Sequence, residues 1–126
     1  MSGTVLVIDG AMTDLGEVVG QVMAEDNGSC VVARDLESAA TLIENVRLDW
    51  IAIDLDVVGG GAAAWLGEIA RTRPELAART LAVMEPPYKR ELAESLEALG
   101  ASILMKPLRA DRLRIELEDV AESSAA

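Results

Sequence analysis

Three charged residues, far apart in the chain, could together carry out chemistry on a phosphoryl group. Asp9 follows the apolar segment 4–8, Asp54 lies near the end of segment 50–55, and Lys106 follows segment 102–105. Two neighbouring carboxylates repel one another, so an ammonium group or a divalent cation is needed to offset their charge. An aspartate beside Mg²⁺ and a lysine is a suitable nucleophile toward phosphorus. Alternatively, Asp54 and Lys106 form a purely structural ion pair.

Five short segments rich in β-branched and aliphatic residues are expected to form the strands that position these side chains. They are 4–8, 29–33, 50–55, 80–84 and 102–105. Segments with helical spacing of apolar residues lie between them, and Thr13 and Asp35 are the expected N-caps of the first two. Such alternation predicts parallel strands joined by right-handed crossovers, with helices on both faces of the sheet.

The later helices are expected over 62–71, 88–99 and 110–121, with a glycine-rich loop over 56–61 and a break at Pro74. In a parallel sheet covered on both faces, functional sites lie at the carboxyl ends of the strands. The topology therefore predicts that Asp9, Asp54 and Lys106 converge at one edge of the sheet, although they are far apart in sequence.

Composition sets limits on the class of protein. The 126 residues suit one domain, expected over 1–121, with a flexible tail over 122–126. A formal net charge of −11 argues against nucleic-acid binding, and no apolar run approaches the ~20 residues of a membrane span. There is no histidine, which excludes histidine zinc sites and Ser-His-Asp triads, and the one cysteine has no internal partner. We expect a soluble, cytoplasmic protein.

Three motifs resemble the receiver domain of bacterial two-component response regulators. They are V-L-V-I-D over 5–9, D-W-I-A-I-D-L over 49–55 and M-K-P over 105–107. The resemblance covers about residues 3–120, with the motifs in the family's order. It implies a flavodoxin-like (βα)5 fold, with a doubly wound parallel five-stranded sheet of order 2-1-3-4-5.

The resemblance also implies a role for individual residues. Asp54 corresponds to the aspartate that accepts a phosphoryl group, and Asp9 to one member of the acidic pair that binds Mg²⁺. The main-chain carbonyl of Asp56 would complete the metal shell together with Asp54. Lys106 corresponds to the lysine that senses the phosphate, and the bond between Lys106 and Pro107 is expected to be cis.

The sequence departs from the family pattern at several positions. Gly10 stands in place of the second metal-binding carboxylate, and Met84 in place of the threonine or serine that binds the phosphoryl group. Glu85 occupies a normally small position, where it adds negative charge or pairs with Lys106 and so holds the site in one state. Ile103 replaces the switch aromatic. These departures predict impaired phosphoryl transfer.

Three functions remain compatible with these residues. In the first, Asp54 takes a phosphoryl group from the phosphohistidine of a histidine kinase or phosphotransfer protein, with Mg²⁺. In the second, the chain is a pseudo-receiver that binds protein partners independently of phosphorylation. In the third, it senses a small ligand such as a nucleotide near Pro107 and Arg109. Beyond self-phosphorylation and self-dephosphorylation, no enzymatic activity is expected, and the chain is either stand-alone or a piece of a larger protein.

A cluster of arginines marks one candidate interaction surface. Arg109, Arg112 and Arg114 begin the last expected helix in an otherwise acidic molecule. Pairing with Glu116 and Glu118 one turn later would leave an ordinary solvated surface. Alternatively, these arginines belong to the face of fourth helix, fifth strand and fifth helix that receiver domains use for homodimers and partners.

Overall fold

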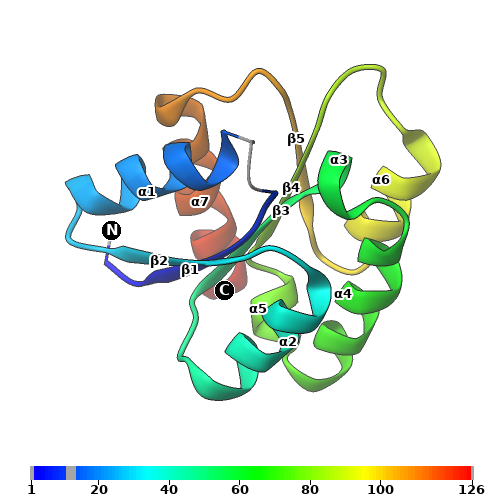
Figure 1. Ribbon diagram of the computed structural model, residues 1–126, viewed down its shortest axis with the longest axis horizontal. Helices are drawn as coiled ribbons and strands as arrows, with labels where there is room; N and C mark the ends of the chain where they lie inside the picture. Colours follow the sequence, from blue (N-terminus) through cyan, green and yellow to red (C-terminus); the bar gives the residue numbers. More distant parts are fainter. Residues whose placement is uncertain (1, 11–13, 126) are drawn as a thin grey trace.

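A parallel five-stranded sheet forms the centre of the molecule (Figure 1). The computed structural model describes residues 2–10 and 14–125, with side chains described for 2–10 and 14–122. The strands are β1 (Thr4–Ile8), β2 (Ser29–Ala33), β3 (Trp50–Asp54), β4 (Thr80–Met84) and β5 (Ser102–Met105). Their order is β2-β1-β3-β4-β5 and every neighbouring pair is parallel. The predicted fold class is confirmed.

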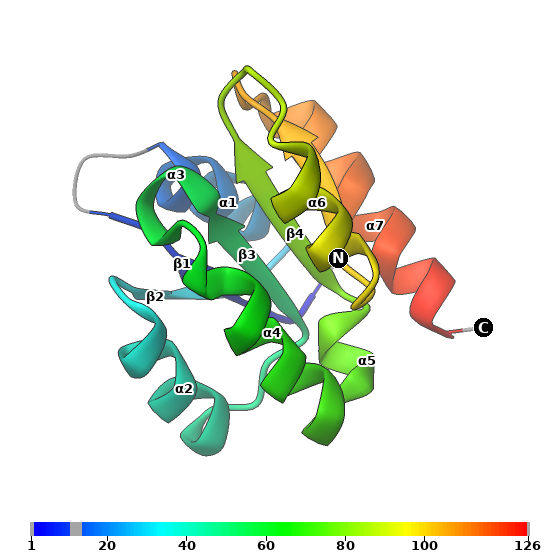
Figure 2. The same cartoon turned by 90° about the vertical axis from the view of Figure 1, so that its right-hand side faces the viewer.

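Helices cover both faces of this sheet (Figure 2). In the described part of the chain they are α1 (Leu15–Glu25), α2 (Leu36–Asn45), α3 (Leu55–Val58), α4 (Gly61–Thr72), α5 (Pro74–Ala77), α6 (Arg90–Glu97) and α7 (Ala110–Ala125). Helices α1 and α7 pack on one face, and their contacts with each other close that layer. Helices α2, α4 and α6 pack on the other, together with the short α3 and α5.

Alternation along each strand divides the core between these two layers. In β1, Leu6 and Ile8 join the cluster beneath α2, α4 and α6, whereas Val5 and Val7 join the cluster beneath α1 and α7. All four side chains are fully buried. Since successive side chains of a strand point to opposite faces, a strand buried on both faces must be apolar throughout. This explains why the strands are continuous apolar runs and why the aliphatic core needs no phenylalanine.

Several element boundaries differ from those expected from sequence. The glycine-rich loop begins with the helical turn α3, because the Asp54 side chain caps it by accepting from the backbone N–H of Asp56. Pro74 begins α5 rather than only ending α4, as its fixed φ suits the first helical position. Helix α6 begins at Arg90, two residues late, and α7 continues to Ala125.

Of the two predicted N-caps, one is confirmed and the other lies outside the described residues. Asp35 caps α2 as expected, its Oδ1 accepting from the backbone N–H of Ser38 at 2.7 Å. Thr13 lies outside the described residues, and α1 has Asp14 at its N-cap position without a side-chain cap hydrogen bond. Among the helices described, none is both long and apolar enough to cross a membrane.

Candidate functional site

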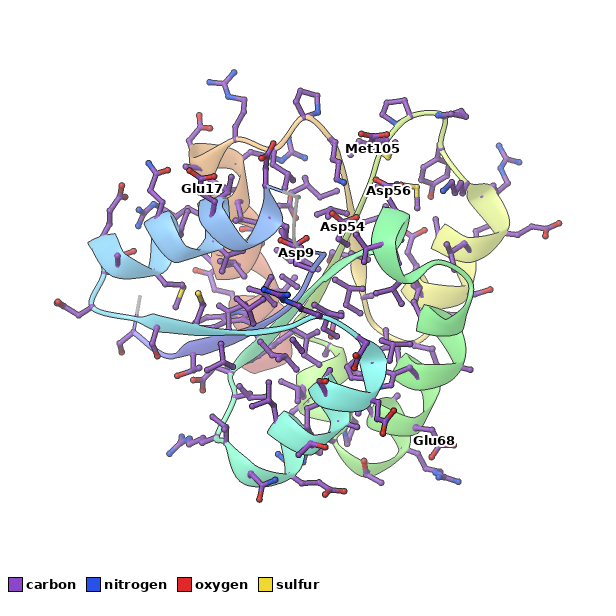
Figure 3. All side chains as sticks on the ribbon, viewed as in Figure 1. Asp9, Glu17, Asp54, Asp56, Glu68 and Met105 are labelled. Carbon is purple, nitrogen blue, oxygen red and sulfur yellow. The ribbon has the colours of Figure 1, made fainter. Side chains whose placement is uncertain are left out.

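The carboxyl edge of the sheet holds a buried aspartate at its centre. Asp54 is the last residue of β3, and its side chain is fully buried. Its Oδ1 accepts from the backbone N–H of Asp56 at 2.9 Å, which fixes the orientation of the carboxylate. Strand β3 lies between β1 and β4, so the loops after both neighbours surround Asp54 (Figure 3).

Lys106 reaches this aspartate from the loop after β5. Its Nζ lies 2.9 Å from Asp54 Oδ2 and also 2.9 Å from Asp56 Oδ2. The loop is tied to β4 by the Lys106 N–H, which donates to the Met84 carbonyl, and the bond between Lys106 and Pro107 is cis. Burial of Lys106 lowers its pKa, but the hydrogen bonds to Asp56 and Asp54 outweigh that effect, so the net pKa is raised. The ammonium therefore stays charged.

Asp9 is the second buried carboxylate at this edge. It follows β1, is 3% exposed, and its Oδ2 accepts from the backbone N–H of Gly16 at 2.8 Å. A Cβ at position 16 would lie 3.3 Å from that oxygen, so glycine permits the close approach of α1. Burial is the largest cause raising the pKa of Asp9. The Gly16 hydrogen bond opposes it, and the nearby Asp54 charge adds to it.

One oxygen of Asp9 forms no hydrogen bond with any residue that the structure describes. Asp9 Oδ1 is buried, yet no donor in the described part of the chain satisfies it. A buried carboxylate oxygen without a donor is costly unless a cation or an ordered water completes it. This orphaned oxygen lies at the same edge as Asp54, as the labelled side chains of Figure 3 show.

Asp56 forms a further set of contacts around Lys106. Its Oδ2 accepts from the backbone N–H of Glu85 at 2.9 Å, and its Oδ1 lies 3.7 Å from Lys89 Nζ. Partial burial would raise the pKa of Asp56, but the hydrogen bonds from Lys106 and the Glu85 N–H outweigh burial and lower it. The Asp56 carboxylate therefore stays ionised and bridges the loops after β3, β4 and β5.

Three of the departures from the family pattern, at Gly10, Met84 and Glu85, lie at this edge, and Ile103 lies nearer the start of β5. Met84 is fully buried at the end of β4, and its Sδ accepts from the Lys89 N–H at 3.5 Å. Ile103 is partly buried on β5, and Gly10 follows Asp9 directly. Glu85 is exposed and does not pair with Lys106 among the residues described: the ammonium is held by two aspartates instead. The pairing considered for Glu85 is therefore wrong, because Asp56 takes that place.

The donor set partly suits Mg²⁺, which receiver domains commonly bind. Mg²⁺ prefers oxygen ligands, keeps several waters and needs few protein carboxylates. Asp9 with its orphaned oxygen, and Asp54 beside it, fit that requirement. Within residues 2–10 and 14–122, however, no group of three or more acidic, histidine or cysteine side chains is arranged to hold a metal ion. Gly10 accounts for one missing carboxylate.

Sequence reasoning missed the side chain of Asp56 and the contribution of Lys89. It assigned only the main-chain carbonyl of Asp56 a role, although the carboxylate contacts both lysines. The sequence did contain a signal for the Asp56 side chain, since a second carboxylate two residues after Asp54, at an edge that is already acidic, needs a cation nearby. Lys89 had no such signal, because only the fold of the loop after β4 brings it there.

Solved structures of signalling proteins match this chain along its length. NtrX from Brucella abortus, in complex with ADP, matches with a TM-score of 0.83 and 26% identity, over 99% of this chain and 27% of NtrX. A response regulator from Thermotoga maritima matches with a TM-score of 0.81 and 18% identity, over 97% of this chain and 99% of the other. This chain has the fold of a response-regulator receiver domain.

The beryllofluoride-activated NtrC4 receiver domain dimer also matches this receiver fold. Its TM-score is 0.81 at 18% identity, with 96% of this chain and 98% of the other covered. The resemblance to receiver domains carried by the three sequence motifs is thus confirmed. The chain spans about a quarter of the length of NtrX. No protein-family model matches the chain, and no curated protein matches it in sequence.

Proposed function

We propose that this receiver domain works in a phosphorelay, with Asp54 as the phosphoacceptor. The donor is the phosphohistidine of a histidine kinase or a phosphotransfer protein. The observation that carries the proposal is the contact of Lys106 Nζ with Asp54 Oδ2 at 2.9 Å, at the carboxyl edge of a receiver fold. Partners of this kind act inside the cell, so the cytoplasm is the proposed location.

The reaction is a transfer between two nucleophiles. A carboxylate oxygen of Asp54 forms a bond to phosphorus, the bond from phosphorus to the partner's imidazole nitrogen breaks, and the imidazole takes up a proton. Lys106 remains cationic and lies where it can neutralise charge on the transferred group. When bound, Mg²⁺ supplies further positive charge there. Asp9, Asp54 and the main-chain carbonyl of Asp56 would hold it.

The same residues support the expectation that transfer is impaired. Gly10 provides no metal ligand, and Met84 cannot donate a hydrogen bond worth about 1.5–3 kcal/mol to a charged group. In addition, the Asp56 carboxylate already occupies both Lys106 and the Glu85 N–H. A phosphoryl group on Asp54 would compete with Asp56 for these donors.

That network also favours the second candidate, a pseudo-receiver that acts without phosphorylation. The Lys106 ammonium already contacts two carboxylates in the unphosphorylated chain. In such a site, contacts among the domain's own side chains already occupy donors that a phosphoryl group would use. In this alternative, partners bind equally well whether or not Asp54 is present.

For either candidate we propose that partners, or a second copy of the chain, bind the face formed by α6, β5 and α7. A hollow of about 530 Å³ lies on it, lined by Ile103, Met105, Pro107 and Ile115 among others. The Ile115 side chain is 52% exposed there, which is unusual for isoleucine. Arg112 and Arg109 border the hollow, each paired with an acid of α7.

Beryllofluoride, a mimic of the aspartyl phosphate, tests the proposal. With Mg²⁺ and beryllofluoride, the amide resonances of 54–56, 85 and 106 should shift in a nuclear magnetic resonance spectrum. The Asp54→Asn variant should show no such shift, because it lacks the carboxylate that the mimic binds. An unchanged wild-type spectrum at saturating beryllofluoride would reject Asp54 as phosphoacceptor and leave the pseudo-receiver.

A further inference from the structure

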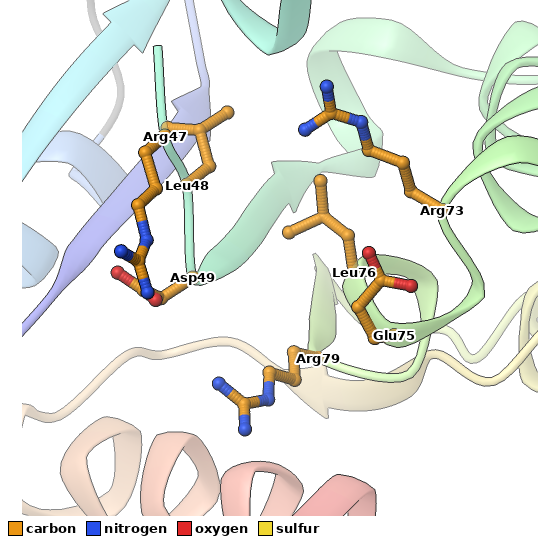
Figure 4. Close-up of a pocket in the computed structure, with 7 residues that line it drawn as sticks. All are labelled: Arg47, Leu48, Asp49, Arg73, Glu75, Leu76 and Arg79. Carbon is orange, nitrogen blue, oxygen red and sulfur yellow. The ribbon is translucent and has the colours of Figure 1, made fainter.

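A cavity at the opposite edge of the sheet has no role in the proposed phosphorelay. Its volume is about 240 Å³, and it lies where the chain enters β3 and β4 (Figure 4). Arg47 precedes β3, Arg73 follows α4 and Arg79 precedes β4, and all three line the cavity. Leu48 and Leu76 lie between them. Asp54 is at the carboxyl end of β3, so the two sites are separated by the length of the strand.

Arg47 and Arg73 form no ion pair among the described residues, although acidic residues are common in this chain. Acids outnumber bases 22 to 11, and six of the bases form ion pairs within the described part of the chain. The guanidinium groups of Arg47 and Arg73, however, form no ion pair with any residue whose side chain the structure describes. Arg79 has an interaction of its own and completes the rim.

Neither acid at the cavity forms an ion pair with Arg47 or Arg73. Asp49 Oδ2 accepts from the backbone N–H of Thr4 at 2.9 Å, which ties that carboxylate to β1. Glu75 is exposed in the first turn of α5. Three arginines against these two acids leave a formal charge of +1 at the cavity, in a molecule whose total is −11. The cavity is therefore locally positive and attracts anions.

The chemistry of the lining indicates the class of anion. A guanidinium presents paired N–H donors that match phosphate oxygens, and two guanidiniums suit a dianion better than a single carboxylate. Leu48 and Leu76 offer apolar contact beside them, and Leu76 is buried. A volume of about 240 Å³ is below the usual range for drug-sized ligands, so the occupant must be small.

We propose that this cavity binds the phosphate group of a small phosphorylated molecule that also has an apolar portion. Arg47 and Arg73 bind the phosphate oxygens, and the two leucines contact the apolar portion. The site is independent of Asp54 and of any phosphoryl transfer. It gives the domain a second input, from a small metabolite, at the edge of the sheet away from the phosphoacceptor.

Phenyl phosphate is the probe for this proposal, with inorganic phosphate and benzoate as comparisons. In a nuclear magnetic resonance titration at millimolar ligand, phenyl phosphate should shift the amides of 47–49 and 73–79. It should bind more tightly than inorganic phosphate, which lacks the apolar portion, and than benzoate, which lacks the dianion. The Arg47→Gln/Arg73→Gln variant should weaken binding by about tenfold or more.

A matched variant separates the cavity from net charge. Arg34 and Arg90 are exposed and, like Arg47 and Arg73, form no ion pair among the described residues, but neither lines the cavity. Arg34→Gln/Arg90→Gln removes the same charge and should leave binding unchanged. The proposal is overturned if the two double variants lose binding equally, if shifts occur only near 54–56 and 106, or if phenyl phosphate binds no better than benzoate. As a control, thermal unfolding of both double variants should show a cooperative transition like that of the wild type.

Discussion

At the scale of single residues, the decisive feature is that two carboxylates share one ammonium. Lys106 Nζ lies 2.9 Å from an oxygen of Asp54 and 2.9 Å from an oxygen of Asp56. Asp56 also takes the backbone N–H of Glu85, a donor directed toward the same edge. Two of the three N–H donors of Lys106 are thus occupied in the absence of phosphate, and a group added to Asp54 competes with Asp56 for its donors.

We predict that Asp56→Ala binds beryllofluoride more tightly than the wild type. The substitution frees Lys106 and the Glu85 N–H, and it removes a negative charge next to Asp54. The gain is expected to be about tenfold, the scale of one charge-assisted hydrogen bond lost by a competitor. Titration followed by the fluorescence of Trp50 and Trp65 measures it.

Asp56→Asn provides the control for this prediction. Asparagine keeps an acceptor for the Glu85 N–H but carries no charge to hold Lys106, so its gain should lie between wild type and Asp56→Ala. Weaker binding in both variants would contradict the competition and would assign Asp56 a supporting role toward the added group.

At the scale of elements, the N-cap of α2 makes a pH-dependent contribution to stability. The backbone N–H of Ser38 donates to Asp35 and lowers the pKa of that carboxyl below the ordinary value for aspartate. A lowered pKa in the folded state means that the stabilisation is complete above about pH 4 and is lost as the pH falls through the folded-state value.

We therefore predict that Asp35→Ala lowers the melting temperature by a few degrees at pH 7 and by much less at about pH 2.5, well below the usual range in which an aspartate ionises. Asp35→Asn keeps a neutral acceptor for the Ser38 N–H, so its deficit at pH 7 should be smaller, and it should nearly vanish at about pH 2.5, where the wild-type carboxyl is neutral as well. Differential scanning calorimetry at several pH values measures both variants. A deficit of equal size at every pH would mean that the charge of Asp35 contributes nothing.

A second element-scale contact joins β3 to the last helix. Trp50 Nε1 donates to the Leu117 carbonyl at 3.1 Å in a buried position, 67 residues along the chain. Phenylalanine in its place would remove this hydrogen bond, while the Leu117 carbonyl, in the interior of α7, keeps its helical backbone donor. A hydrogen bond of this kind contributes about 0.5–1.5 kcal/mol.

Trp50→Phe should accordingly lower the free energy of unfolding in urea by about 0.5–1.5 kcal/mol beyond the cost of the smaller ring. Trp65 is half-buried on α4 and forms no hydrogen bond through its indole within the part of the chain that is described, so Trp65→Phe is the matched substitution. Trp65→Phe should lower the free energy of unfolding by a smaller amount. Equal losses would show that ring volume, and not the hydrogen bond, determines the effect.

At the scale of the whole molecule, charge opposes folding while the two-layered core favours it. The net charge of −11 is spread over a chain of only 126 residues, so compaction brings like charges together. Ion pairs such as Arg71 with Glu68 and Arg109 with Asp111 are exposed, and exposed pairs contribute little to stability. The contacts of Lys106 with Asp54 and Asp56 are more buried.

We predict that the melting temperature at pH 7 rises when NaCl is increased from about 20 mM to about 500 mM, because salt screens the repulsion. The rise should shrink near pH 4, where many of the carboxylates are protonated. Circular dichroism during heating follows both conditions. A fall in melting temperature with salt would mean that attractive ion pairs outweigh the repulsion.

The order of residues along the chain was enough to predict the elements and the edge at which they place charged residues. Continuous apolar runs such as 50–53 and 81–84 are readable because both faces of the central strands are buried, which favours apolar residues at successive positions. The convergence of Asp9, Asp54 and Lys106 follows from parallel strands alone. These inferences rest on local periodicity and on topology, and both can be inferred from the sequence pattern.

The contacts between side chains, in contrast, became known only from the folded molecule. Lys106 pairs with Asp56 as well as Asp54, and Glu85 contributes its backbone N–H instead of its carboxylate. Arg47 and Arg73 meet at a cavity although they are far apart in the sequence. Side-chain partners depend on loop paths and on competition among many nearby charges, and differences of about 1 kcal/mol select among them. Local sequence patterns do not encode differences that small.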